Sequence, residues 1–171
     1  MSKQLDEGNL QFQFPAFTSA ERFDSKELNA FGMKCVDFVA EDEESLYFIE
    51  VKDYQHPNAT PERRKIDYET LIAAVENKES VFSLEIGGKI KDSLLRKFST
   101  GEKFSKKVIY LLLINLDKFS EFERGLLMTK ISGHVPTGLN ESRFSAFTSI
   151  AFDLVNPEQL KKYGITCTQK K

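Results

Sequence analysis

The residues of this chain whose types and spacing could do chemistry lie in the segment 34–53, KCVDFVAEDEESLYFIEVKD. Two runs of strand-forming residues flank the polar stretch EDEES, a pattern that predicts a β-hairpin. Because side chains alternate along a strand, Glu50 and Lys52 lie on one face. With Asp37 on the first strand, two carboxylates and a lysine predict a site for metal-assisted hydrolysis.

The turn of the hairpin fixes which residues face each other. If the turn is centred between Glu43 and Glu44, the position numbers of antiparallel partners sum to 87, which sets Asp37 opposite Glu50. Cross-strand partners share a face, so Asp37, Glu50 and Lys52 should converge. Their expected apolar neighbours are Cys35, Val39 and Phe48, and the opposite face is expected to hold Val36, Phe38, Ile49 and Val51.

The two carboxylates predict a bound Mg²⁺ ion, with Mn²⁺ as the alternative. Neighbouring carboxylates repel each other and are costly to desolvate unless a cation compensates them. Mg²⁺ prefers oxygen ligands and keeps several waters, so Asp37, Glu50, the Val51 carbonyl and a phosphate oxygen suffice. Lys52 would orient or help to deprotonate the attacking water and offset charge on the phosphorus. The predicted reaction is phosphodiester hydrolysis. An exposed cross-strand ion pair is the alternative explanation.

This arrangement resembles the PD-(D/E)xK nuclease superfamily, also called restriction-endonuclease-like, and in particular its uncharacterised small bacterial members. The resemblance rests on RFD at 22–24, GMKCVDF at 32–38 and YFIEVKDY at 47–54. It implies that Asp37 is the metal-binding Asp, Glu50 the second acidic ligand and Lys52 the catalytic lysine. Val36 stands where the family often has proline.

The same resemblance implies an accessory acidic residue, because the family often supplies a Glu from a helix before the first core strand. Glu21, Asp24 and Glu27 are the candidates, and Asp24 is slightly favoured because it lies in the RFD run. A surface residue or a helix cap also explains each of them taken singly.

The hydrophobic pattern of the remaining chain predicts strands early and alternating helices and strands later. The pattern of residues 19–32 does not decide between helix and strand. The expected strands are an edge strand at 10–17 and buried strands at 106–116 and 147–155; the expected helices are 60–85, ended or kinked by Gly87-Gly88, then 89–98, 119–131 and 157–164. The fold class is therefore α/β, bordering on α+β: a mixed sheet with an antiparallel motif hairpin and flanking helices, a restriction-endonuclease-like core in one domain, 1–171.

Charge is unevenly distributed along the 171 residues, whose formal net charge is −2. Residues 1–60 hold twelve acidic against five basic residues, and residues 89–107 hold seven basic against two acidic ones. A cation site beside a phosphate-binding face and merely solvated helix faces explain this equally well. Arg63, Arg64 and Lys65 are the candidate contacts to a DNA backbone, and a solvated helix turn is the alternative.

Other residues give weaker signals. Gly87-Gly88-Lys89 lacks the spacing and the Ser or Thr of a phosphate-binding loop. His56 is near enough to line the site, although a loop histidine without a role explains it better, and His134 stands alone. Cys35 is expected to be a buried core thiol, and no cysteine cluster holds zinc.

The sequence predicts a cytoplasmic protein, because the N-terminus is polar and the longest apolar run, 108–116, is too short for a membrane span. A Mg²⁺-dependent nuclease acting on DNA is the leading expectation. A non-catalytic nuclease-fold protein with a binding, regulatory or inhibitory role is the alternative. A homodimer or a larger protein complex is left open, as is an RNA substrate.

Overall fold

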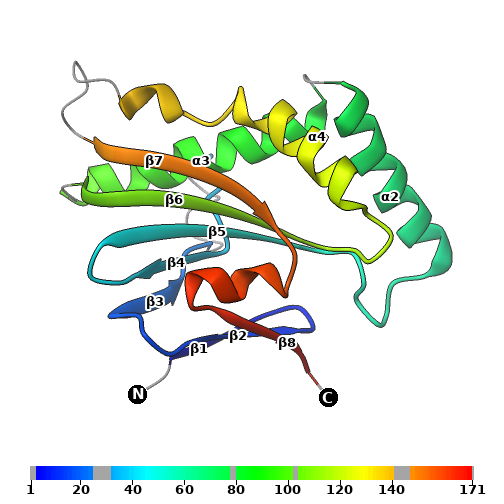
Figure 1. The fold of residues 1–171 in the computed structure, drawn as a ribbon, viewed down its shortest axis with the longest axis horizontal. Coiled ribbons are helices and arrows are strands. Elements are labelled where there is room, and N and C mark those ends of the chain that lie inside the picture. Colours follow the sequence, from blue (N-terminus) through cyan, green and yellow to red (C-terminus); the bar gives the residue numbers. More distant parts are fainter. Residues whose placement is uncertain (1–2, 25–31, 78–79, 102–103, 141–146, 171) are drawn as a thin grey trace.

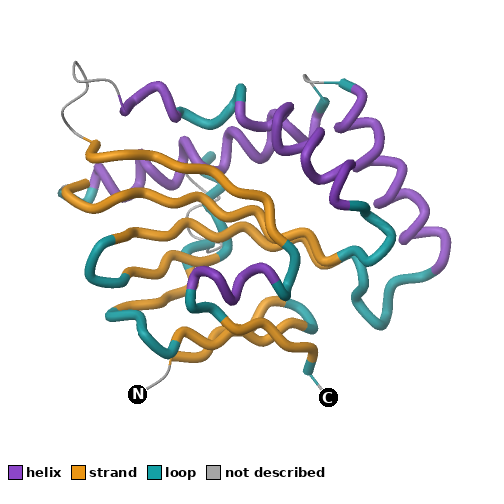
Figure 2. The backbone as a smooth tube through the Cα atoms, viewed as in Figure 1, coloured by secondary structure: helices purple, strands orange, loops and turns teal. Residues whose placement is uncertain are grey.

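The computed structural model describes residues 3–24, 32–77, 80–101, 104–140 and 147–170. Three layers are stacked in it (Figures 1 and 2). Helices cover one face of a five-stranded sheet, and a three-stranded antiparallel sheet covers the other face. None of the helices in these ranges is long and apolar enough to cross a membrane.

The five-stranded sheet is mixed, as the sequence predicts. Its order is β3 (Ser19–Arg22), β4 (Phe38–Glu41), β5 (Ser45–Asp53), β6 (Phe104–Asn115) and β7 (Phe147–Val155). The first three strands are antiparallel, whereas β5, β6 and β7 are parallel. The α/β class with an antiparallel hairpin and flanking helices is thus confirmed.

The central strand β6 is buried on both sides, which explains its almost unbroken apolar sequence. Tyr110 and Leu112 belong to the core beneath the helices, and Ile109 and Leu111 to the core beneath the small sheet. Cys35 also lies in the helix-side core as a free, fully buried thiol, as predicted.

The small sheet corrects one prediction. Residues 10–17 were expected to form an edge strand, but β2 (Leu10–Phe14) is central, between β1 (Lys3–Glu7) and β8 (Thr166–Gln169). Its apolar side chains pack on the larger sheet, where Phe12 meets Phe38 edge to face with ring centroids 5.1 Å apart. Both neighbouring strands are short and rich in polar residues, so their own pattern carries little signal.

The helices α2 (Pro61–Glu76) and α3 (Val81–Ser99) correct a second prediction. The sequence predicted one helix over 60–85 that ends or kinks at Gly87-Gly88. Instead the break falls before Ser80, whose side chain caps α3, and α3 runs through both glycines. Gly87 is required by packing, because a Cβ there would lie 2.5 Å from the Cβ of His134.

The two adjacent glycines provide a matched test of this packing. Gly87→Ala should lower the free energy of unfolding by about 1–3 kcal/mol, because the added Cβ would also lie 3.0 Å from the backbone oxygen of His134, so the backbone has to shift. Gly88→Ala should raise it by about 0.5–1 kcal/mol, because a Cβ there meets no atom within 4 Å. Urea unfolding of both variants measures the difference, and equal effects would contradict the close approach.

The remaining elements complete the helix layer and the C-terminus. Helix α4 (Glu121–Ser132) begins with a capping box formed by Ser120 and Glu123, close to the predicted start. The short turn η1 (Thr137–Asn140) precedes β7. The helix predicted at 157–164 is a 3₁₀ segment, η2 (Gln159–Tyr163), which ends at Gly164 in the left-handed conformation.

Candidate functional site

The hairpin β4–β5 has the register that the sequence predicts. Phe38 pairs with Ile49 and Glu41 with Leu46, so each pair of position numbers sums to 87. Asp37 immediately precedes β4 and therefore lies at the level of Glu50, where the chain enters the sheet.

The predicted faces are correct along the paired residues. Val39 and Phe48 lie in the helix-side core, and Phe38, Ile49 and Val51 in the opposite core. Val36 is the exception, because it lies with Cys35 in the helix-side core. Both precede β4, so strand alternation does not apply to them; instead the N–H of Val36 donates to the Ser93 hydroxyl on α3 at 3.0 Å.

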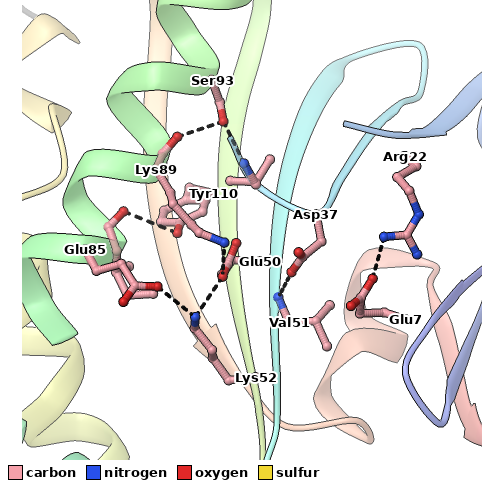
Figure 3. Close-up of polar contacts among 12 residues, drawn as sticks. Glu7, Arg22, Asp37, Glu50, Val51, Lys52, Glu85, Lys89, Ser93 and Tyr110 are labelled. Atoms are coloured by element: carbon pink, nitrogen blue, oxygen red, sulfur yellow. Dashed lines mark hydrogen bonds and ion pairs between the residues drawn. The ribbon is translucent and has the colours of Figure 1, made fainter. Parts of the chain in front are cut away.

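Glu50 is the most deeply buried acidic group of the site, with only 1% of its surface exposed. Its Oε1 lies 2.7 Å from Lys89 Nζ and 3.1 Å from Lys52 Nζ (Figure 3). Its Oε2 is buried and has no hydrogen-bond partner within the described part of the chain. An acceptor in this state is costly, so Glu50 has one oxygen free for a further ligand.

Asp37 is also buried, with 8% of its surface exposed. Its Oδ2 accepts a hydrogen bond of 2.6 Å from the backbone N–H of Val51. Burial raises the pKa of Asp37 to about 7, and the negative charge of Glu50 adds to this, although Lys89 and the Val51 N–H oppose it. Near neutral pH, the metal-free site therefore holds Asp37 partly protonated.

Val51 lies between the two functional side chains of β5. The N–H and C=O of one strand residue point to the same edge, and its N–H points to Asp37. We therefore expect the Val51 carbonyl to face the same edge, beyond the end of β4.

Lys52 lies between two carboxylates, 3.1 Å from Glu50 Oε1 and 3.1 Å from Glu85 Oε1. Burial alone would lower the pKa of the Lys52 ammonium, but the charges of Glu50 and Glu85 raise it well above its usual value. Lys52 is consequently a fixed positive charge and hydrogen-bond donor in this state. This state favours orientation and charge compensation as its roles over proton abstraction from water.

Two residues of the site, Glu85 and Lys89, were not among the predicted ones. They are four residues apart on α3, so both face β5 from one side of that helix (Figure 3). Burial tends to raise the pKa of Glu85, but the charge and hydrogen bond of Lys52 outweigh it and lower that pKa. A helix predicted without interruption would have placed Glu85 and Lys89 on the same face. The break expected at Gly87-Gly88 concealed it.

Ser93 connects this helix to the Asp37 segment. Its hydroxyl donates to the carbonyl of Lys89 at 2.7 Å and accepts from Val36 N–H. Val36, the residue before Asp37, is thus bonded to α3, the helix that supplies Lys89. This bond connects the segment that carries Asp37 to the helix whose lysine pairs with Glu50.

The accessory candidates are less closely placed. The N–H of Phe23 donates to the Asp37 carbonyl at 2.8 Å, so the RFD run does lie beside the site. Asp24 is half-buried there, but within the described ranges its carboxylate forms no hydrogen bond or ion pair with Asp37, Glu50 or Lys52. Glu21 is exposed on β3, opposite Val39. Glu27 lies outside the described residues.

The basic residues predicted to contact DNA form the first turns of α2. Arg63 pairs with Asp67 at 3.0 Å, Arg64 donates to the His56 carbonyl at 3.4 Å, and Lys65 lies 3.8 Å from Glu69. Their part in DNA binding stays a prediction.

Two hollows of about 360 Å³ are each lined in part by residues of the ion network. One is lined by Lys52, Arg63 and His56, and the other by Lys34, Glu85 and Lys89. His56 therefore borders the site, although its Nδ1 also accepts a local hydrogen bond of 3.2 Å from Asn58 N–H. These hollows are the routes by which a ligand would approach Lys52 and Lys89.

Asp37 predicts a pH dependence of stability for the metal-free protein. Because its pKa is about 7 in the folded state against 3.8 ordinarily, the folded state binds more protons between these values. The contribution of Asp37 to the free energy of unfolding therefore falls as pH rises through this window. Asp37→Asn removes the titration and retains an acceptor for Val51.

We expect the stability of Asp37→Asn relative to wild type to rise by about 3 kcal/mol between about pH 4.5 and about pH 8. Urea unfolding in EDTA measures this at each pH. A difference that does not change with pH would contradict the raised pKa of Asp37.

The site thus joins two buried carboxylates, of which one has a free oxygen, to two lysines and a third carboxylate. With Asp37 ionised, the three carboxylates exceed the two lysines by one negative charge. Comparison of the chain with protein-family models, with curated proteins and with solved structures finds no match, so its function has to be inferred from this geometry.

Proposed function

We propose that this protein is a metal-dependent nuclease that hydrolyses DNA phosphodiester bonds, with Asp37, Glu50 and Lys52 as its catalytic residues. The observation that carries the proposal is the buried Glu50 Oε2, which has no hydrogen-bond partner in the described chain, together with the buried carboxylate of Asp37, whose pKa the charge of Glu50 helps to raise. Native proteins rarely leave such an atom without a partner unless it has a function.

The donor set fits Mg²⁺ or Mn²⁺. The Asp37 and Glu50 carboxylates and the Val51 carbonyl would hold the ion, and all three are oxygen ligands. The excess negative charge of the site when Asp37 is ionised favours a cation here. When bound, such an ion would activate water and polarise a phosphoryl oxygen.

The chain's own residues have separate roles in this proposal. Lys52, held as a cation by Glu50 and Glu85, would bind a phosphate oxygen and offset the charge that develops on the phosphoryl group. Lys89 holds the Glu50 carboxylate in place through the ion pair of 2.7 Å to its Oε1. Glu85 positions Lys52 at the hollow that Arg63 and His56 also line.

The order of elements supports a restriction-endonuclease-like core. The antiparallel pair β4–β5 carries Asp37 at its start and Glu50 and Lys52 at its end. Helices α2 and α3 follow, then β6 beside β5, helix α4 and β7. This is the order that the resemblance to PD-(D/E)xK nucleases implies, with one helix more.

Calorimetric titration with Mg²⁺ and Mn²⁺ tests the proposal at its first step. Wild type should bind an ion, and Asp37→Asn should weaken binding at least about tenfold by removing one charged ligand. Glu43→Gln removes a negative charge from the turn of the same hairpin, where Glu43 is exposed, and should bind like wild type. Absence of binding to wild type would overturn the proposal.

The alternative is a non-catalytic protein with a nuclease fold that acts as a binding, regulatory or inhibitory module. One observation favours it: Lys52 and Lys89 already compensate Glu50 Oε1 without any metal. In that case neither ion binds, and wild type and Lys52→Ala alike leave single-stranded and duplex DNA intact in Mg²⁺ or Mn²⁺.

A further inference from the structure

A second feature of the molecule is a basic and aromatic groove beside the proposed site. It is a cavity of about 770 Å³ between the start of α2 and the loop that follows β6. Two tyrosines and three cationic side chains line it, with one acidic residue: Tyr54, Tyr68, Arg64, Lys65, Lys118 and Asp117. Its volume is in the range of cavities that hold small ligands.

The groove is continuous with the proposed catalytic residues. Tyr54 follows directly after β5 and packs against the helix-side core, on the side of the sheet where Glu50 and Lys52 meet α3. Tyr54 also lines the hollow of about 360 Å³ that contains Lys52 and Arg63. The ends of β5 and β6 and the start of α2 all lie on the same side of the molecule, at the right in Figure 1.

The charge of the groove distinguishes it from a neighbouring cavity that shares Gln55, Leu116 and Asp117 with it. That cavity, of about 830 Å³, is lined by Asp117, Glu121 and Glu158 against Arg124 alone, which would repel a phosphate. The groove, by contrast, has three cationic side chains and one acidic side chain. Lys118 is exposed, and among the described residues the Arg64 side chain makes only a long contact of 3.4 Å with a carbonyl, so both can reach a phosphate.

The tyrosines indicate which form of nucleic acid the groove would take. Bases that are free of a duplex stack on aromatic side chains, whereas the stacked bases of a duplex have no free faces to offer. The Tyr68 hydroxyl donates to Glu123 at 3.1 Å, which fixes the ring before any ligand arrives. A preformed aromatic surface between cations therefore suits an unpaired strand.

We propose that this groove binds an unpaired DNA strand and leads it to Lys52. The inference rests on the proposed function for its choice of DNA, and it adds the substrate class: single strands, frayed ends or flaps. Tyr54 and Tyr68 stack on bases, and Arg64, Lys65 and Lys118 bind the backbone.

Binding in EDTA tests the groove without cleavage. The probe is a fluorescein-labelled 12-nucleotide thymidine strand, alone or paired with its complement, followed by anisotropy over a range of salt concentrations. The single strand should bind at least about tenfold more tightly than the duplex. Tyr68→Ala should weaken it by about 1–3 kcal/mol, converted from the measured fold-change, as loss of one stacked base predicts.

A pair of lysines separates the groove from general electrostatic attraction. Lys118→Gln should reduce the salt slope of binding by about 0.7, the value for one phosphate contact to a single strand. Lys91→Gln removes the same charge from an exposed position on α3 and should leave the slope unchanged. The groove proposal would be overturned if the two lysine variants had equal effects on the salt slope. It would also be overturned by tighter binding of the duplex, or of the matching uridine RNA, than of the single DNA strand.

The outcome also separates this proposal from the nuclease proposal. Cleavage in Mg²⁺ that Lys52→Ala abolishes and Tyr68→Ala and Lys118→Gln leave intact would refute the groove alone. Single-strand binding that depends on Tyr68 and Lys118, with no metal bound and no DNA cut, would refute the nuclease alone.

Discussion

Replacing Lys52 by alanine is expected to reduce DNA cleavage at least about 100-fold, the usual loss when one preorganised donor to a developing charge is removed. The ammonium of Lys52 is held 3.1 Å from Glu50 and 3.1 Å from Glu85, at the mouth of the hollow where a phosphate would approach. Initial rates on a labelled single strand and on the matching duplex, in Mg²⁺ and in Mn²⁺, measure the loss.

The effect on the metal should have the opposite direction, and this distinguishes a catalytic role from a structural one. Lys52 places a positive charge beside a proposed metal ligand, so its removal should maintain or strengthen calorimetric binding of Mg²⁺. Loss of cleavage together with loss of metal binding would mean that the site has collapsed. Cleavage within about threefold of wild type would exclude a catalytic role for Lys52, since even one positioned donor contributes more.

The control for Lys52→Ala is Lys91→Ala, which removes an exposed lysine from α3. Lys52→Arg adds a second comparison. It retains the charge but replaces a compact ammonium by a planar guanidinium, so its activity should recover only in part. Full recovery would mean that charge alone matters at this position.

The register of the site residues could be predicted because it is local. Once the turn is centred at Glu43-Glu44, the position of the turn sets the pairing of the two strands, and Phe38 does pair with Ile49. The same reasoning failed for Val36, one residue before Asp37. There the backbone leaves the ladder to bond with Ser93, a residue of α3 far along the chain.

The two site residues that the sequence did not predict, Glu85 and Lys89, depend on contacts between distant segments. Glycine pairs commonly end helices, but Gly87 lies inside α3 because His134 packs against it. The local sequence pattern does not show that contact. It therefore does not show that α3 continues through the glycines and carries Glu85 and Lys89 on one face. The short strand β8 went unpredicted for a related reason: it pairs with β2 from the other end of the chain.

Lys89 is expected to be the residue on which the stability of the metal-free site most depends. Its ammonium lies 2.7 Å from Glu50 Oε1, and the side chains of Lys89 and Glu50 are 12% and 1% exposed. Lys89→Met should lower the free energy of unfolding by about 3 kcal/mol, because removal of one partner leaves the buried carboxylate undercompensated. Lys52 remains beside Glu50, so we expect the low end of the range for buried pairs.

A double-mutant cycle with Glu50→Gln isolates this interaction. The loss in free energy of unfolding of the double variant should be smaller than the sum of the two single losses by about 1–3 kcal/mol, as expected for directly coupled residues. Urea unfolding in EDTA gives these values, and Lys91→Met on the exposed face of α3 is the matched control. An effect of Lys89→Met no larger than that of the control would show that Glu50 does not need Lys89.

Metal then supplies the decisive comparison. If Lys89 and a divalent cation both compensate Glu50, Mg²⁺ should stabilise Lys89→Met more than wild type, because the ion replaces the charge that was lost. The increase in melting temperature on adding Mg²⁺ should therefore be larger in Lys89→Met and absent in Lys89→Met combined with Glu50→Gln. A Mg²⁺ effect that persists without Glu50 would place the ion elsewhere in the molecule.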